Sequence, residues 1–489
     1  MTITDGTAVA AAAVPRAGPA TRAAAPPQDE TSGADLVLPL VAVGAAGVLA
    51  GYGYVRRTRR ARTRTTPGGG PAPPPEPAPD TALDERARAS LVLADDCVRA
   101  SREELGFVEA GLGATAAAPY ARVLRQAEAE LAAAFALRRR YDHGLPGDPA
   151  ARRQALAGMT GRCEETGRLL DAAAGGFDTL RGLDRDVREA LEVAEARFRE
   201  LAGRTTAAET LLSGLARRYA PSASEHATGH AEQAKDRLVF ATVRLNQARQ
   251  SADSGGTPAA ALHLRAAEGA VAQAAVFLDG VERLAAGLDE AAALLPAALT
   301  GAETERGGAR DQVLDAPAGE VRARLLHADA VLASVRGELT ARRPHDPVDA
   351  LRRVVRAAAP LAAGRTGVLS AAALLVARGT VTAAAGFVTT HRGAVGAAAR
   401  TLLAEAERLL ASASPTDHLH ADSLAREARE LAEQDVRARG NPYAEADALV
   451  SGTAGAVLGG VLLPVGLPAG VPVGFGGPRT RARRAAPAP

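Results

Sequence analysis

The chain has 489 residues and a mass of 49.8 kDa, and 47% of its residues are apolar while only 3% are aromatic. Trp is absent and isoleucine occurs only at Ile3, so strand-favouring residues are scarce and small or unbranched apolar residues dominate. This composition argues against an all-β protein or a doubly wound enzyme and favours long helices. A formal net charge of +2 argues against a nucleic-acid surface.

An uncharged run occupies residues 36–55 and is followed directly by the sequence RRTRRARTR. A helix of this length matches the roughly 30 Å hydrocarbon core of a bilayer. The alternative, a cleaved signal peptide, would carry its positive charge before the apolar run. The positive-inside rule then predicts a single-pass plasma-membrane protein with its N-terminus outside and the following chain in the cytoplasm. The arginines expected to contact anionic lipid headgroups are Arg56, Arg57, Arg59, Arg60, Arg62 and Arg64.

Three further stretches are expected to lack a folded core. Residues 1–35 read as a disordered extracytoplasmic tail, and 56–80 as an Arg-rich and then Pro/Gly-rich linker. Residues 441–489 read as a Gly/Pro-rich low-complexity tail. A second membrane contact at 448–477 is the less favoured alternative, because prolines at every fourth residue near its end would break a helix.

Between 81 and 440 the apolar residues recur with a helical period, which predicts seams buried between neighbouring helices. The predicted seam residues are Leu83, Ala87, Ser90, Ala94, Cys97 and Ser101; Val187, Leu191, Ala194, Phe198, Leu201, Thr205, Ala208, Leu212 and Leu215; and Ala231, Ala234, Leu238, Ala241, Leu245 and Ala248. The prediction is an all-α protein in which one N-terminal transmembrane helix precedes an extended Ala-rich bundle or coiled coil with disordered tails. A degenerate array of helical hairpins is the weaker alternative.

Several helix starts are marked by a capping residue followed by proline. These pairs are Asp148 with Pro149, Thr257 with Pro258, Asp346 with Pro347, and Ser414 with Pro415. Ser222 with Glu225 reads as a capping box. Breaks are expected near Gly111, Gly144, Pro221, Gly255, Pro344 and Gly440.

No catalytic motif stands out in the chain. Cys97 and Cys163 lie in no metal-binding spacing, and Cys97 reads as a core filler whose acidic neighbours raise the thiol pKa. His226 and His230 are four residues apart but lack a third ligand, so a solvated helix face is favoured over a metal site.

Two other features are also interpreted as structural. His418 and His420 lie between two aspartates at a helix start, where acids favour the helix dipole. Lys235 is the single lysine, which we attribute to compositional bias. We therefore predict a non-enzymatic chain with no cofactor, no metal and no small-molecule substrate.

The chain resembles actinobacterial TPM-domain membrane proteins. The resemblance covers roughly residues 36–477 and rests on the span with its basic cluster, ASREELGFVEA at 100–110, AEQAKDRLVFATVRLNQARQSADSG from 231, RAAEGAVAQAA at 265–275, VTTHRGAVGAAARTLLAEAERLL at 388–410 and LAEQDVRARGNPY at 431–443. It implies an extracytoplasmic, phosphatase-like TPM domain before the span and a cytoplasmic helical region after it. Only 35 residues precede the span here, so no catalytic residue can be transferred.

Two functions follow as expectations. The first is a membrane-anchored helical scaffold of the bacterial cell envelope, whose partners are membrane lipids and either another protein or a second copy joined through helical seams. The alternative is a truncated gene model of a phosphatase-like TPM-domain protein. Nucleic-acid binding through the arginine clusters is the weakest reading, and we expect none.

Overall fold

The computed structural model describes residues 80–312, 318–341, 343–361, 367–438 and 474–485. All of them belong to one compact unit, Ala78–Pro489. Every regular element among these residues is a helix, and none of them forms a strand, as the composition predicts. The predicted span at 36–55, the arginine cluster at 56–64 and the linker lie outside the described residues.

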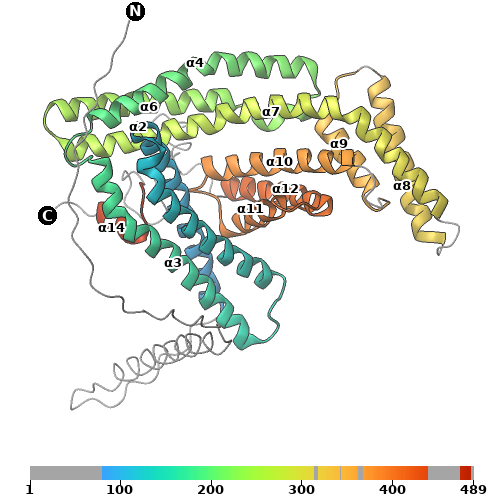
Figure 1. Cartoon of the computed structure of the whole chain (residues 1–489), viewed down its shortest axis with the longest axis horizontal. Helices are drawn as coiled ribbons and strands as arrows, with labels where there is room; N and C mark the ends of the chain where they lie inside the picture. The colour runs from blue at the N-terminus through green and yellow to red at the C-terminus, as the bar shows by residue number, and fades with distance from the viewer. Residues whose placement is uncertain (1–79, 313–317, 342, 362–366, 439–473, 486–489) are drawn as a thin grey trace, which may run out of the picture. The chain divides into compact units, whose positions relative to one another are not determined.

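From α2 to α12 the helices follow one another with short connections. Their bounds are α2 (Asp80–Asp142), α3 (Pro149–Arg181), α4 (Arg188–Arg218), α5 (Pro221–Ser224), α6 (His230–Asp253), α7 (Thr257–Gln312), α8 (Ala318–Thr340), α9 (Pro347–Ala358), α10 (Gly367–Thr390), α11 (Ala397–Leu410), α12 (Pro415–Ala438) and α14 (Pro478–Ala485), with a 3-10 turn at Glu225–Ala227. Helix α7 is the common element, because α4, α6, α9 and α10 all pack against it (Figure 1).

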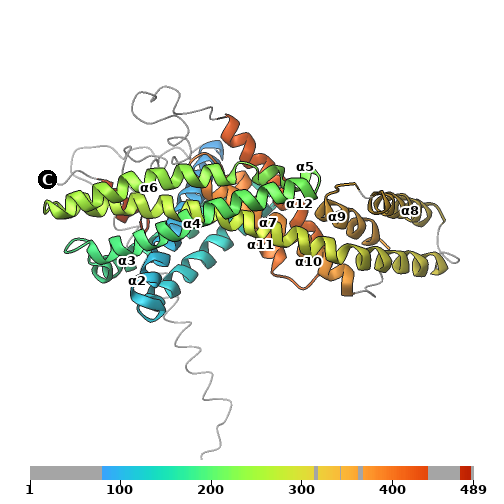
Figure 2. The ribbon, with the colours of Figure 1, turned by 90° about the horizontal axis from the view of Figure 1, so that it is seen from above.

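Helical hairpins and a three-helix group build the fold around α7. Helix α2 is kinked at Gly113, close to the break predicted near Gly111, and α3 packs against both of its halves. Helix α6 pairs with α7, as the view from above shows (Figure 2). Helices α10, α11 and α12 form the third group, and α11 also packs against α2. The structure confirms a helical bundle, whereas a continuous coiled coil is not shown.

The predicted seams are buried. Of the residues from 231 to 248 predicted to face the core, all six are buried, and so are most of the two other sets. The cores are rich in Ala and Leu, which allows close approach of helices but removes little apolar area per residue. Stability therefore accumulates over long interfaces, such as that of the 56-residue α7.

Local signals place most helix ends correctly. The Asp148 side chain accepts a hydrogen bond from the Ala151 backbone N–H, and the Asp346 carboxylate accepts one from the Asp349 N–H. Ser414 caps α12 through the Asp417 N–H at 3.4 Å. The capping box predicted at Ser222 is wrong, because α5 begins one residue earlier and the Ser222 hydroxyl contacts Asp346 instead.

Helix α10 is long and apolar enough to cross a membrane, with a mean hydropathy of 1.6 over its most apolar 18 residues. It also packs against α7, α9, α11 and α12, as the core helix of a bundle does. Leu369, Val376, Val381 and Val388 are among its buried residues. Composition alone does not separate these two roles, so α10 is weak evidence for membrane association.

Candidate functional site: the docked C-terminal segment

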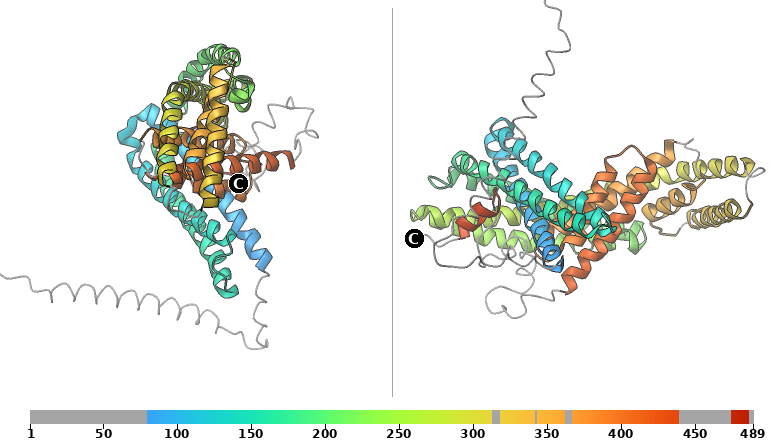
Figure 3. Two further views of the ribbon diagram at one scale, coloured as in Figure 1. Left: turned by 90° about the vertical axis from the view of Figure 1, so that its right-hand side faces the viewer. Right: turned by 90° about the horizontal axis from the view of Figure 1, so that it is seen from below.

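Residues 474–485, with the sequence GFGGPRTRARRA, lie against α2 and α3; we call them the C-terminal segment (Figure 3). This corrects the prediction of a disordered tail for this part of 441–489. The face that holds the segment, here called the docking groove, is made by Asp96, Ser101, Glu104 and Tyr120 of α2 and by Asp171 and Phe177 of α3.

Phe475 is the apolar anchor of the segment. Its ring is fully buried and stacks on Phe177, with 4.2 Å between centroids and 14° between planes. Tyr120 meets the same ring edge-on at 6.0 Å. Burying a phenyl ring from water contributes roughly 2 to 3 kcal/mol, and aromatic contacts add to this.

Backbone N–H groups of the segment are matched by oxygens of the groove. The Phe475 N–H donates to the buried Glu104 carboxylate, and the Gly476 N–H donates to the Ser101 hydroxyl at 3.2 Å. Asp171 accepts from two N–H groups in the first turn of α14, at 3.2 Å and 2.9 Å. A carboxylate of another helix thus caps α14, where the partial positive charge of a helix N-terminus favours an anion.

Three glycines allow this approach. A Cβ at Gly474 would lie 2.5 Å from a Glu104 carboxylate oxygen, and one at Gly477 would overlap the Gly167 carbonyl oxygen. Gly476 has φ +136°, a conformation that side-chain-bearing residues rarely adopt, and a Cβ there would meet Thr480. The glycines are therefore steric requirements of docking.

Two arginines close the contact at the far end. Arg481 is buried and donates to the Asp96 carbonyl oxygen at 2.6 Å. Arg484 donates to the Asp178 carboxylate at 2.5 Å. Arg481 retains two guanidinium nitrogens without a hydrogen-bond partner, so its burial carries a desolvation cost.

Glu104 connects the segment to the helices beneath it. Arg181 donates to its carboxylate at 2.7 Å and Arg265 of α7 donates at 3.3 Å, while Arg181 also pairs with Glu268 of α7. Burial alone would raise the pKa of Glu104, but Arg265, Arg181 and Arg484 outweigh burial and hold this pKa well below its usual range. The carboxylate is therefore ionised and structural.

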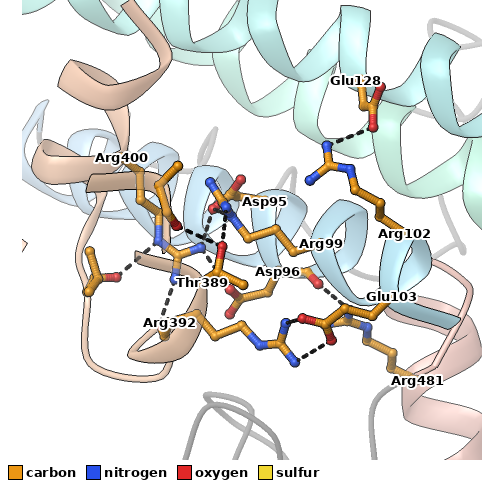
Figure 4. A network of polar contacts seen from close by, with 12 residues as sticks. Asp95, Asp96, Arg99, Arg102, Glu103, Glu128, Thr389, Arg392, Arg400 and Arg481 are labelled. Carbon is orange, nitrogen blue, oxygen red and sulfur yellow. Dashed lines mark hydrogen bonds and ion pairs between the residues drawn. The ribbon is translucent and has the colours of Figure 1, made fainter. Parts of the chain in front are cut away.

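A second buried network lies next to the first and ties α2 to the turn before α11 (Figure 4). Arg400 of α11 donates to both Asp95 and Asp96, the latter at 2.7 Å, and to the Arg392 carbonyl oxygen at 2.6 Å. Arg392 in turn donates twice to Glu103, at 2.7 Å and 3.0 Å. The two networks share α2. Its acids at 95, 96, 103 and 104 contact α3, α7, α11 with the turn before it, and the C-terminal segment.

The structure can be compared with the sequence interpretation for each residue singled out above. The six lipid-contacting arginines between Arg56 and Arg64 lie outside the described residues. Cys97 is confirmed as a core residue, and burial, together with nearby carboxylates, raises the pKa of its thiol to about 11. Lys235 pairs with Glu209 and Glu232 on the surface.

Two histidine interpretations need correction. His230 is not solvated; it is half-buried and its ring meets Phe277 edge-on at 5.1 Å. His418 is buried and its Nε2 contacts the Ser412 carbonyl oxygen, whereas His420 is exposed. Asp417 lies in the first turn of α12, as the helix-dipole interpretation expects, whereas Asp422 lies further along the helix, is buried and accepts from Arg352 and Arg356. Among the described residues no group of three or more His, Cys, Asp or Glu could hold a metal ion.

We expect the free energy of unfolding to fall as the pH drops from about 6.5 to 4. Burial lowers the pKa of both His230 and His391 to about 4, and nearby arginines add to this. In this window the unfolded chain binds protons that the folded chain does not, so stability rises with pH and is lost on acidification. The loss is about 3.4 kcal/mol at most for each ring.

Urea titrations at a series of pH values measure this dependence. Changing both His230 and His391 to Gln should make the dependence less steep between pH 6.5 and 4. It should not abolish the dependence, because burial also lowers the pKa of His226 and of His263. The exposed His327 serves as a control, because His327→Gln should leave the dependence unchanged. A wild-type stability that is constant over this window would contradict the assignment.

No protein-family model matches the chain, and no solved structure matches it. Among curated proteins it is similar to UPF0603 protein MT2410 and UPF0603 protein Rv2345 of Mycobacterium tuberculosis, each 29% identical over 426 residues. The match covers 82% of this chain and 64% of each relative, so the chain spans less than two thirds of their length. These relatives agree with the actinobacterial part of the resemblance, while the TPM domain stays a prediction. The chain is thus similar, over most of its length, to actinobacterial UPF0603 proteins.

Proposed function

We propose that this chain is a non-enzymatic, single-pass membrane-anchored scaffold whose helical region binds protein partners on the cytoplasmic side of the bacterial envelope. The observation that carries the proposal is that the buried ionisable groups around the docking groove pair with one another across helices. Glu104, Asp95 and Asp96 are each buried and matched with arginines of other helices. Groups held this way stabilise one arrangement of helices and are engaged by arginines, which disfavours their use as general acids or bases.

The space beside these groups supports the same proposal. The recess next to Glu104, lined in part by Ala100, Phe107 and Gly269, has a volume of about 10 Å³. A cavity of this size holds no more than about one water molecule. The long helices, in contrast, offer extended charged faces suited to protein partners.

The membrane part of the proposal rests on the apolar run at 36–55 and the arginines that follow it. We expect the full chain to sediment with membranes and a variant lacking 36–55 to remain in the soluble fraction. If a chain lacking 36–55 still sedimented with membranes, the anchor would lie in another element. Among the described residues, α10 is the candidate.

Changing Arg56, Arg57, Arg59 and Arg60 to Glu should invert or block insertion, because the positive charges that hold this side in the cytoplasm are replaced by negative ones. A cysteine placed at position 5 should then lose its accessibility to a membrane-impermeant thiol reagent added outside. The native thiols do not interfere, since Cys97 and Cys163 are buried. Unchanged labelling of position 5 would refute the predicted orientation.

The alternative is a part of a phosphatase-like TPM-domain membrane protein. Its support is the resemblance together with the 64% coverage of the relatives. An in-frame TPM sequence in the genomic DNA before Met1 would favour this alternative over the scaffold.

A further inference from the structure

We propose that the docking groove is a recognition site for the Gly-Phe-Gly-Gly-Pro-Arg sequence, and that the C-terminal segment of a second copy fills it, so that copies associate by exchanging their ends. The inference deepens the proposed scaffold function by naming a partner, and it rests on that function. It is carried by the contacts of the segment, which are complete within twelve residues.

The segment docks as a linear motif. One aromatic ring, four backbone N–H groups and two arginine side chains make its contacts, and all the acceptors for these groups belong to α2 and α3. None of these contacts depends on the residues that join the segment to α12. A motif with this property makes the same contacts whichever chain supplies it, and the connecting residues set only its effective concentration.

The groove selects its ligand by exclusion as well as by attraction. The glycine positions have no room for a Cβ, so an Ala-rich sequence, which this chain has in abundance, is rejected. The aromatic position is enclosed by Phe177 and Tyr120. The acidic residues Asp171 and Asp178 favour a helix N-terminus followed by arginines. The ligand class is therefore a short cationic peptide with one phenylalanine between glycines.

The length of the connection permits exchange. Helix α12 ends at Ala438 and the segment begins at Gly474. The 35 residues of positions 439–473 span at most roughly 115 Å. This exceeds the length of the 33-residue α3, about 50 Å, so chain length does not restrict the segment to the groove of its own copy.

Two full-length variants test the segment and the groove one at a time. Phe475→Ala removes the anchor but leaves the groove intact. Asp171→Lys repels the N-terminus of α14 and its arginines, and Asp171 has no other hydrogen-bonded partner among those the structure records. Because Asp171 is only half-buried, this change should not disturb the bundle. Circular dichroism of each variant should match the wild-type spectrum.

The experiment reconstitutes the two variants in nanodiscs, each alone or both together in the same disc, and counts the copies per disc by mass photometry. Each variant alone should stay monomeric, while the mixture should form one-to-one pairs, because one chain supplies a free segment and the other an empty groove. Asp184→Lys is the matched control: it makes the same charge change on an exposed aspartate just after α3 and leaves segment and groove intact, so it should self-associate to the same extent as the wild type.

A labelled peptide of residues 470–489 reports on recognition by itself. It should bind Phe475→Ala at least 10-fold more tightly than Asp171→Lys. Absence of peptide binding would overturn the recognition site. Peptide binding without pairing of the two variants would overturn the exchange between copies. Either result leaves the membrane-sedimentation outcome unaffected, so failure of this inference is distinguishable from failure of the scaffold.

Discussion

Replacing Arg400 by methionine lowers the free energy of unfolding by about 3 to 5 kcal/mol, the effect expected when one partner of a buried ion pair is removed. The Arg400 side chain is fully buried and is the donor shared by Asp95 and Asp96. It also donates to the Arg392 and Val395 carbonyl oxygens, which holds the turn between α10 and α11. Without it, two buried carboxylates lose their common cation.

Arg408 offers a matched control on the same helix. It pairs with Glu405 at the surface, where its side chain is 61% exposed. An exposed pair of this kind contributes about 0 to 1 kcal/mol, so Arg408→Met should leave stability almost unchanged. Urea unfolding followed by circular dichroism measures both variants. Equal losses for the two would contradict the assignment of Arg400 as a central tie between α2 and α11.

Replacing Gly477 by alanine is expected to release the C-terminal segment. The added Cβ would overlap the Gly167 carbonyl oxygen and approach Asp171 within 2.8 Å. The first of these atoms belongs to the α3 backbone and cannot move aside. Release exposes Phe475, whose burial is comparable to that of a core phenylalanine, about 3 kcal/mol or more. Amide exchange of residues 474–485 should then accelerate by at least ~100-fold.

Gly175 on α3 provides the control for this substitution. A Cβ at Gly175 meets nothing within 4 Å, so Gly175→Ala should leave exchange in the C-terminal segment unchanged. Hydrogen exchange read by mass spectrometry measures both variants on the same peptides. Full protection of the segment in Gly477→Ala would show that the docked arrangement does not need glycine at this position.

The fold was largely predictable because its signals are local. Seam residues such as Ala234, Leu238 and Ala241 recur at the helical period, and a proline after Asp148 or Asp346 marks a start within one turn. Where a cap depends on two positions, as in the proposed box at Ser222, the prediction failed because a distant carboxylate, Asp346, provides a different partner.

The docking groove could not be found the same way. Phe475 and Glu104 are 371 residues apart, and no periodicity links them. The average composition of 441–489 is that of a low-complexity tail, which conceals twelve residues with a defined shape. Two signals were present: a single phenylalanine between glycines, and a glutamate at position 104, three residues after the seam residue Ser101. A charge in a seam indicates a buried partner, but the sequence does not say which one.

The histidines show the same limit. The spacing of His226 and His230 predicts a solvated helix face, because the sequence of one helix does not show which other helix packs against it. Phe277 of α7 covers the His230 ring, a contact that only the pairing of α6 with α7 creates.

The central claim, a membrane-anchored scaffold for protein partners, is tested most directly by proximity labelling in cells. The labelling enzyme is best inserted at the turn around Gly255, which lies between α6 and α7 and leaves the C-terminal segment free. A variant lacking 36–55 removes membrane bystanders, and Arg400→Met disrupts the helical region. The account predicts a reproducible set of labelled proteins that is lost only when the helical region is disrupted. Labelling that matches an unrelated membrane protein carrying the same enzyme would contradict it.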